Sequence, residues 1–137
     1  MKETTKKNIP IAMELPFEFA PKEYSLKGWG TVDFFCEQDG VLVFLEIEEG
    51  QLHPNSNVLK DWPFLEENPD RKILLIQVFR GSKKKASPNR VKLCSFTGRK
   101  LEELFPKRFR YYTYDWESGT QDHTNKILKK FSELKNT

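Results

Sequence analysis

The chain has 137 residues, of which 37% are hydrophobic and 31% charged, a composition that excludes a fibrous or wholly disordered protein. A chain of this length makes one domain and buries roughly two-thirds of its unfolded surface without needing disulfides. Its net charge of +3 is mild, so the total charge alone excludes no class of partner. We therefore expect a single domain over residues 1–137, with a flexible arm at 1–10.

Cysteine content and the lack of long apolar runs indicate the compartment. Cys36 and Cys94 lie far apart without a CxxC motif, which favours a reducing environment and gives no zinc pattern. No apolar run approaches the ~20 residues of a membrane helix, and no apolar stretch follows the charged N-terminus as in a secretory signal. We expect a cytoplasmic protein with no membrane association.

The first half of the chain predicts a hairpin followed by a crossover. Prolines within residues 11–27 leave room only for a short helix or turn near 22–26. Asp39-Gly40 predicts a tight turn between strands at 31–38 and 41–49. A helix is expected over 55–67, restarting or kinking at Pro63, and the continuous apolar run 72–79 predicts a strand buried on both faces.

In the second half, residues 80–90 predict a loop, 91–96 a further strand and 98–105 a short helix. A strand is expected at 109–116 and an amphipathic helix at 120–134. These elements predict an α/β protein with a central mixed β-sheet, in which an antiparallel hairpin is followed by a βαβ crossover and helices flank the sheet.

The hairpin brings acidic residues together. With Asp39-Gly40 as the two turn residues, Asp33 faces Glu46 and Thr31 faces Glu48. One face of the hairpin is wholly apolar and predicts the core, while Asp33, Glu46 and Glu48 share the far end of the other. Opposed carboxylates repel, so a shared proton, a nearby Lys or Arg, or a divalent cation is expected to compensate. Alternatively, this face is simply solvated.

This arrangement resembles the PD-(D/E)XK, restriction-endonuclease-like nuclease superfamily, in an E-x-E variant of its motif. The resemblance covers VDFFCEQDGVLVFLEIEEGQ (32–51), helix 55–67 and strand 72–79, and it implies a restriction-endonuclease-like fold. By resemblance Asp33 and Glu46 would ligate Mg²⁺ or Mn²⁺. Glu48, where most members have lysine, would be a further metal ligand or orient the attacking water.

The same resemblance suggests further residues. Some members carry the basic residue on the following helix, where Lys60 stands, so Lys60 would supply the catalytic positive charge. Gln51 falls where some members have a site glutamine. Many members add an acid from an N-terminal helix, for which Glu18 and Glu23 are the candidates.

Residues outside the motif have two interpretations each. His53 either orients water or contacts phosphate, or is a surface histidine at a helix entry. Asn57 and Lys60 share a helix face that is either solvated or functional, and the buried face is expected to hold the remaining apolar positions, Val58, Leu59, Trp62 and Leu65.

Two basic segments are candidate nucleic-acid contacts. The loop at 80–92 has no acid and includes Lys83, Lys84, Lys85 and Arg90, which suits phosphate contact but also a plain solvated loop. Residues 107–116 interleave cations with aromatics, a pattern of base stacking, although alternate aromatics in a strand mostly form core.

The leading hypothesis is a Mg²⁺-dependent nuclease acting on DNA or RNA, with Asp33, Glu46, Glu48 and Lys60 as catalytic residues. The alternatives are a nucleic-acid-binding module of this fold that has lost cleavage, and a protein-interaction domain whose acids are solvated. The chain could act as a homodimer or as one subunit of a larger complex.

Overall fold

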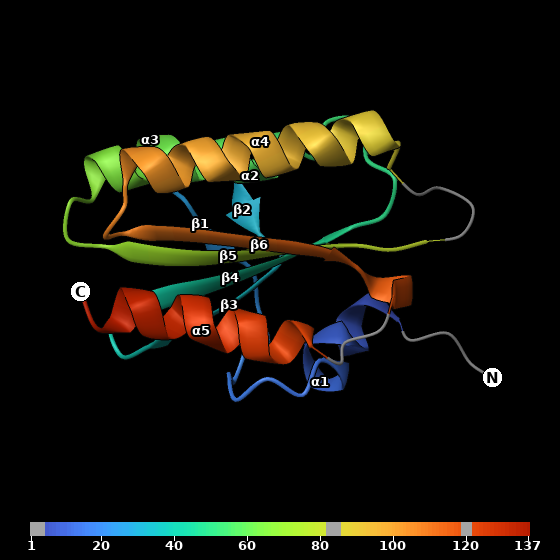
Figure 1. The fold of residues 1–137 in the computed structure, drawn as a ribbon, viewed down its shortest axis with the longest axis horizontal. Helices are drawn as coiled ribbons and strands as arrows, with labels where there is room; N and C mark the ends of the chain where they lie inside the picture. Colours follow the sequence, from blue (N-terminus) through green and yellow to red (C-terminus); the bar gives the residue numbers. More distant parts are fainter. Residues whose placement is uncertain (1–4, 82–85, 119–121) are drawn as a thin grey trace.

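The computed structural model describes residues 5–81, 86–118 and 122–137. A four-stranded sheet lies between two layers of helices, with α2, α3 and α4 on one face and α5 and α1 on the other (Figure 1). The elements in chain order are the 3-10 helix η1 (Lys6–Asn8), α1 (Ile9–Ala12), β1 (Tyr24–Ser25), β2 (Thr31–Val32), β3 (Phe34–Gln38), β4 (Val41–Glu48), α2 (Ser56–Leu59), α3 (Asp61–Glu67), β5 (Lys72–Phe79), α4 (Pro88–Leu104), β6 (Phe109–Asp115), the 3-10 helix η2 (Trp116–Ser118) and α5 (His123–Lys135).

The main sheet has the order β3-β4-β5-β6. β3 is antiparallel to β4, and β4, β5 and β6 are parallel, so the predicted α/β class with a mixed sheet is confirmed. The predicted hairpin register is also confirmed, because Phe34 pairs with Leu45 and Gln38 with Val41. Asp39 and Gly40 adopt φ values of 52° and 79°, the left-handed conformation that a tight hairpin turn requires.

Both faces of β4 are covered. All eight of its residues are buried, because the positions that alternate along the strand join two different hydrophobic clusters. Val43 and Leu45 face the α5 side, whereas Leu42 and Phe44 face the α3 and α4 side. The hypothesis that one face of the hairpin is solvated is therefore wrong for β4.

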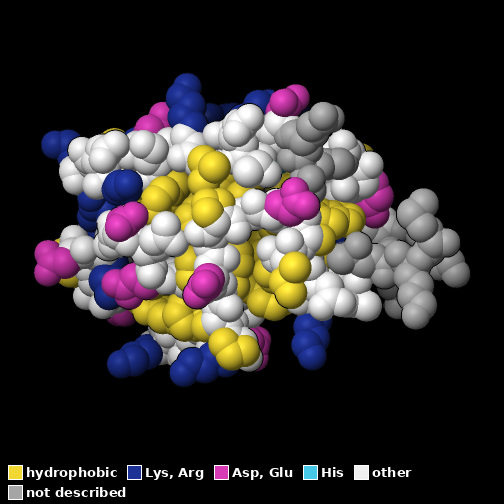
Figure 2. Space-filling model, turned by 90° about the horizontal axis from the view of Figure 1, so that it is seen from below, with side chains coloured by type: hydrophobic (Ala, Val, Ile, Leu, Met, Phe, Trp, Pro, Cys, Tyr) yellow, Lys and Arg dark blue, Asp and Glu magenta, His cyan; other side chains and the backbone are white. Residues whose placement is uncertain are grey.

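The face formed by α5 and α1 carries apolar side chains at its centre, with charged side chains scattered around them (Figure 2). A shallow hollow beside α1 is lined by Ile11, Leu15 and Phe19. Leu15 and Phe19 are only partly exposed, because they pack against the core cluster beneath. Leu15 and Phe19 thus belong to the outer layer of the core, whereas Ile11 is 79% exposed.

The predicted strand at 91–96 is wrong, since these residues lie in one continuous helix, α4, which begins at Pro88, within the loop predicted for 80–90. The helix predicted at 98–105 is confirmed as the C-terminal part of α4, which ends at Leu104. Pro88 stands in its first turn, where a missing N–H is tolerated. Its buried residues Cys94, Gly98 and Leu101 recur every three or four positions, which is helical spacing. A short apolar run does not distinguish strand from helix on its own.

The N-terminal half differs from the prediction in three places. Residues 31–38 form two strands that are interrupted by a bend at Asp33, and β2 pairs with β1 in a separate two-stranded sheet. Thr31 therefore pairs with Ser25 rather than facing Glu48. Residues 22–26 contribute β1 instead of a short helix. Part of the predicted arm is folded, because η1 and α1 carry the fully buried Ile9.

The predicted helix at 55–67 is divided at Lys60 into α2 and α3. Val58 and Leu65 are buried as expected, but Leu59 and Trp62 are exposed by 40% and 39%. Asp61 is buried instead. The strands at 72–79 and 109–116 and the C-terminal helix are confirmed, with the helix starting at His123. In the part of the chain that is described, no helix combines the length and apolarity needed to cross a bilayer.

Candidate active site

The predicted acids meet where β4 ends and the chain bends between β2 and β3. The Asp33 backbone N–H donates to Glu46 Oε1 at 2.9 Å, and the Ile47 N–H donates to Asp33 Oδ2 at 3.0 Å. At the bend, two backbone N–H groups thus donate to carboxylates. Asp33 and Glu46 lie opposite each other as predicted, each held by the backbone of the other's strand.

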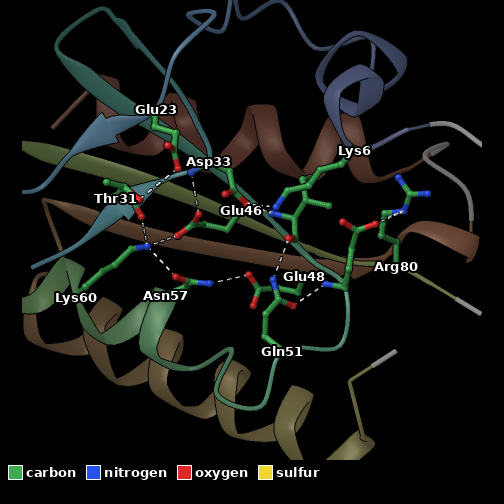
Figure 3. A network of polar contacts seen from close by, with 12 residues as sticks. Lys6, Glu23, Thr31, Asp33, Glu46, Glu48, Gln51, Asn57, Lys60 and Arg80 are labelled. Carbon is green, nitrogen blue, oxygen red and sulfur yellow. Dashed lines mark hydrogen bonds and ion pairs between the residues drawn. The ribbon is translucent and has the colours of Figure 1, made fainter. Parts of the chain in front are cut away.

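Helix α2 and the residue that follows it supply the polar partners of these acids (Figure 3). Lys60 Nζ donates to Glu46 Oε2 at 2.5 Å, to Asn57 Oδ1 at 2.7 Å and to the Thr31 carbonyl at 2.5 Å. Asn57 Nδ2 in turn donates to Glu48 Oε1 at 2.8 Å. The interpretation of Asn57 and Lys60 as a solvated helix face is wrong, since both side chains point at the acids.

Both glutamates are buried, at 2% exposure for Glu46 and 0% for Glu48. Burial raises the pKa of Glu46 to about 7, against the opposing effect of the Lys60 ammonium. Burial also raises the pKa of Glu48 to about 7, against the Asn57 hydrogen bond. One of the three expected compensations is present, because the Lys60 ammonium lies beside Glu46. The raised pKa of the two glutamates comes first from burial.

Two buried carboxyl groups at the site have oxygens without a hydrogen bond. Within the described residues, Glu48 Oε2 and both oxygens of Asp61 have no hydrogen-bond partner. Burial, and then the nearby charge of Glu46, raise the pKa of Asp61 well above its ordinary value. A buried acceptor without a donor destabilises a protein. These oxygens could therefore accept a hydrogen bond or a metal bond from a ligand next to the network.

Two cations that the sequence did not single out for this site approach it from other elements. Lys6 Nζ from η1 lies 3.3 Å from Asp33 Oδ2. Arg80, directly after β5, is 5% exposed and places Nε 3.5 Å from Glu49 Oε2. The only sequence signal for Lys6 is the spacing of Ile9 and Met13 behind it, which anchors the segment in the core.

The accessory residues of the prediction differ in their positions. Gln51 braces the end of β4, because its Oε1 accepts from the Glu49 N–H at 2.6 Å and its Nε2 donates to the Ile47 carbonyl at 3.5 Å. His53 is exposed and joins the structure through its carbonyl, which accepts from Ser56 at 2.8 Å. Its side chain is therefore a surface histidine at the helix entry.

The candidate N-terminal acids do not stand on a helix. Glu23 precedes β1 and accepts from the Thr31 hydroxyl at 3.3 Å. Glu18 lines a hollow with Cys36 and Gln38, beside the turn end of β3. Figure 3 shows Glu23 at the edge of the polar network, next to Thr31.

The candidate nucleic-acid contacts are only partly described. Lys83, Lys84 and Lys85 lie outside the described residues, and Arg90 is half-buried in the first turn of α4. In the segment 107–116, Arg108 Nη1 donates to the carbonyls of Leu65 and Asn68 at 3.1 Å. Of its aromatics, Phe109, Tyr111 and Tyr114 are buried. At least half of the aromatics there form core, as expected.

The donor set at the site suits a hard divalent cation. No group of three or more His, Cys, Asp or Glu side chains capable of sharing one metal occurs in the described ranges. Mg²⁺ does not need such a group, because it is usually bound by one or two carboxylates and keeps several waters. Asp33 and Glu46 are the two carboxylates that could hold such a cation. The predicted three-ligand set is wrong for this geometry, because Glu48 does not complete a metal-binding group with them.

Comparison with known families, curated proteins and solved structures finds no match for this chain. The fold and the site geometry therefore supply the evidence for function.

Proposed function

We propose that the protein is a divalent-cation-dependent nuclease of restriction-endonuclease-like fold, which hydrolyses phosphodiester bonds of DNA or RNA. The proposal depends on one observation above all. Asp33, at the bend between β2 and β3, and Glu46, on β4, each accept a backbone N–H from the other's segment, and the Lys60 ammonium is bonded to Glu46. Two carboxylates and an ammonium in a partly buried site are the groups that metal-assisted phosphoryl transfer needs.

Each residue of the site has a separate role in this proposal. Asp33 and Glu46 would hold Mg²⁺ or Mn²⁺, which when bound polarises a phosphodiester oxygen and acidifies a coordinated water. Lys60 supplies positive charge next to the phosphate as its negative charge grows. Glu48, with a pKa raised to about 7 by burial, is suited to accept a proton near neutral pH. Asn57 fixes the orientation of Glu48 through its 2.8 Å hydrogen bond.

A second candidate function has its own supporting observation. Lys60 bonds to Glu46 Oε2 at 2.5 Å, so an ammonium already neutralises the carboxylate that a metal would use. A protein that binds nucleic acid in this fold without cleaving it would keep such a pair for structural reasons. The third hypothesis is a protein-interaction domain whose acids are solvated. The burial of Glu46 and Glu48 argues against it.

The test combines calorimetric titration of Mn²⁺ with a cleavage assay on single- and double-stranded DNA and RNA. Glu46→Gln keeps the shape of the side chain and removes its charge, so we expect it to abolish Mn²⁺ binding and to lower cleavage by about 10²-fold or more. Glu37→Gln is the matched control, because Glu37 lies on β3 of the same hairpin with an exposed side chain.

The outcomes separate the candidates. Mn²⁺ binding and cleavage that both need Glu46 support the nuclease. Metal-independent binding of nucleic acid without cleavage supports the second candidate and overturns the first. If Glu46→Gln binds Mn²⁺ and cleaves like the wild type, the assignment of this site is wrong.

A further inference from the structure

Apolar side chains are concentrated on the outer surface of α4 and the neighbouring α2–α3 segment. Large apolar side chains there are exposed by between 39% and 53%, namely Leu59, Trp62, Leu93, Phe96 and Leu104. They lie outside the two core clusters, unlike the partly buried Leu15 and Phe19 on the opposite face. A contiguous exposed apolar surface of this kind usually marks an interface.

The surface is hollowed into a groove. It has a volume of about 420 Å³ and runs between Leu59 and Trp62 on one side and Phe96, Leu101 and Leu104 on the other. Leu93, Phe96, Lys100 and Leu104 recur along α4 with the spacing of one helix face. The inner face of the same helix is already occupied, because Cys94, Gly98 and Leu101 are buried. The outer stripe is about half exposed among the described residues and can therefore receive a second helix.

The charges of α4 favour a copy of the same helix in the opposite direction. Arg90 and Lys92 lie in its first half, Arg99 and Lys100 follow its middle, and Glu102 and Glu103 stand at its end. Glu102 is ion-paired with Lys130 at 3.0 Å. Glu103 pairs with Lys100 at 3.2 Å, but this exposed pair is weak, so Glu103 can exchange it for a cation of a second copy. Lys92 and Glu103 lie on the same flank of the apolar stripe, at nearly equal distances from its middle. A twofold axis perpendicular to α4 therefore brings Lys92 next to Glu103 of the second copy, twice per dimer. An antiparallel pair also places opposite helix dipoles side by side.

We propose that the chain forms a homodimer through this surface, in which the α4 helices of two copies pack antiparallel and fill the groove of each other. Leu93 of one copy meets Leu104 of the second, and the two Phe96 side chains lie near the axis. A parallel arrangement would instead oppose the basic starts of both helices. The inference is independent of the proposed nuclease activity, since none of these residues belongs to the acidic site.

The experiment measures the oligomeric state of the full chain by sedimentation velocity over a wide range of protein concentration. We expect a concentration-dependent dimer, which Phe96→Glu converts to monomer. Lys92→Glu alone and Glu103→Lys alone each place like charges together twice, and each should weaken the dimer by about tenfold. Lys129→Glu, an exposed reversal on α5, is the control and should leave the dimer unchanged.

Mixing the two charge variants gives the sharpest result. In a heterodimer of Lys92→Glu with Glu103→Lys, both contacts again join opposite charges, so association should return to near the wild-type level. A wild-type protein that stays monomeric, a dimer that survives Phe96→Glu, or a mixture that associates no better than its components would overturn the proposal. Circular dichroism tests whether each variant is folded. If Phe96→Glu does not fold, the charge variants alone test the dimer.

Discussion

Replacement of Glu48 by glutamine removes a buried negative charge and leaves the shape of the side chain nearly unchanged. Burial raises the pKa of Glu48 from 4.5 to about 7. Because the folded-state pKa lies above the unfolded-state value, the protein is at its most stable with respect to this group below about pH 4.5. It then loses stability as the pH rises through about 7. The difference between the two pKa values corresponds to a loss of at most ~3 kcal/mol in the free energy of unfolding.

The glutamine variant should recover most of this loss. Its amide oxygen still accepts from Asn57, while its amide nitrogen takes the position of the unsatisfied Oε2 and remains unpaired. We therefore expect Glu48→Gln to raise the free energy of unfolding by about 1–3 kcal/mol at about pH 8, and to have little effect at about pH 4.5. Urea denaturation at both pH values, with a chelator present to remove divalent cations, measures the difference.

Glu37→Gln is the control for the chemical change itself. The Glu37 side chain is 52% exposed and pairs with Arg71 at 2.8 Å, so its replacement should change stability by less than about 1 kcal/mol at either pH. A Glu48→Gln protein that is less stable than the wild type at about pH 8 would refute the reasoning. So would a gain of equal size at both pH values, since it could not come from ionisation.

Three further outcomes are expected. Mn²⁺ affinity should rise between about pH 6 and 8, and binding should release protons, because burial raises the pKa of both site glutamates to about 7. Calorimetry in two buffers of different ionisation enthalpy measures the protons released. An affinity that does not change with pH would contradict this prediction. Lys6→Ala removes the ammonium 3.3 Å from Asp33 and should strengthen Mn²⁺ binding by about 2–5-fold, whereas the exposed Lys7→Ala should not. Gly98→Ala places a methyl group 2.3 Å from the Tyr111 ring, so thermal or urea unfolding should show a loss of about 1–3 kcal/mol; an unchanged stability would mean that α4 moves away from β6 without resistance.

The hairpin and the parallel strands could be predicted because their signals are local. Asp39-Gly40 sets the turn, and the turn sets the register that brings Asp33 beside Glu46. The apolar run 72–79 is too uniform for a half-exposed strand, and the structure places it between two neighbours. In each case the pattern within one short segment was enough to predict the strand and how it pairs.

Other features depend on contacts between distant segments and gave no local signal. The run 91–96 is equally compatible with a strand and with the helix that it forms, and only packing of Gly98 against Tyr111 distinguishes the two. The approach of Lys6 to Asp33 needs Ile9 to be buried under α5. The exposure of Leu59 and Trp62 follows from the break at Lys60, which turns Lys60 toward the acids.

The acids of β4 are the least favourable part of this fold, and that supports a role for them. A strand buried on both faces, as β4 is, would be more stable with valine at the positions of Glu46 and Glu48, yet both positions carry carboxyls whose pKa is raised by burial. Natural proteins accept such conflicts mainly where function requires them. A divalent cation held by Asp33 and Glu46 would resolve this one directly, because it replaces the proton of Glu46 and its positive charge favours the ionised form of the neighbouring Glu48. The same exchange would free the Lys60 ammonium from Glu46 for contact with a phosphate, so the interaction that now neutralises the site would become the one that recognises its substrate.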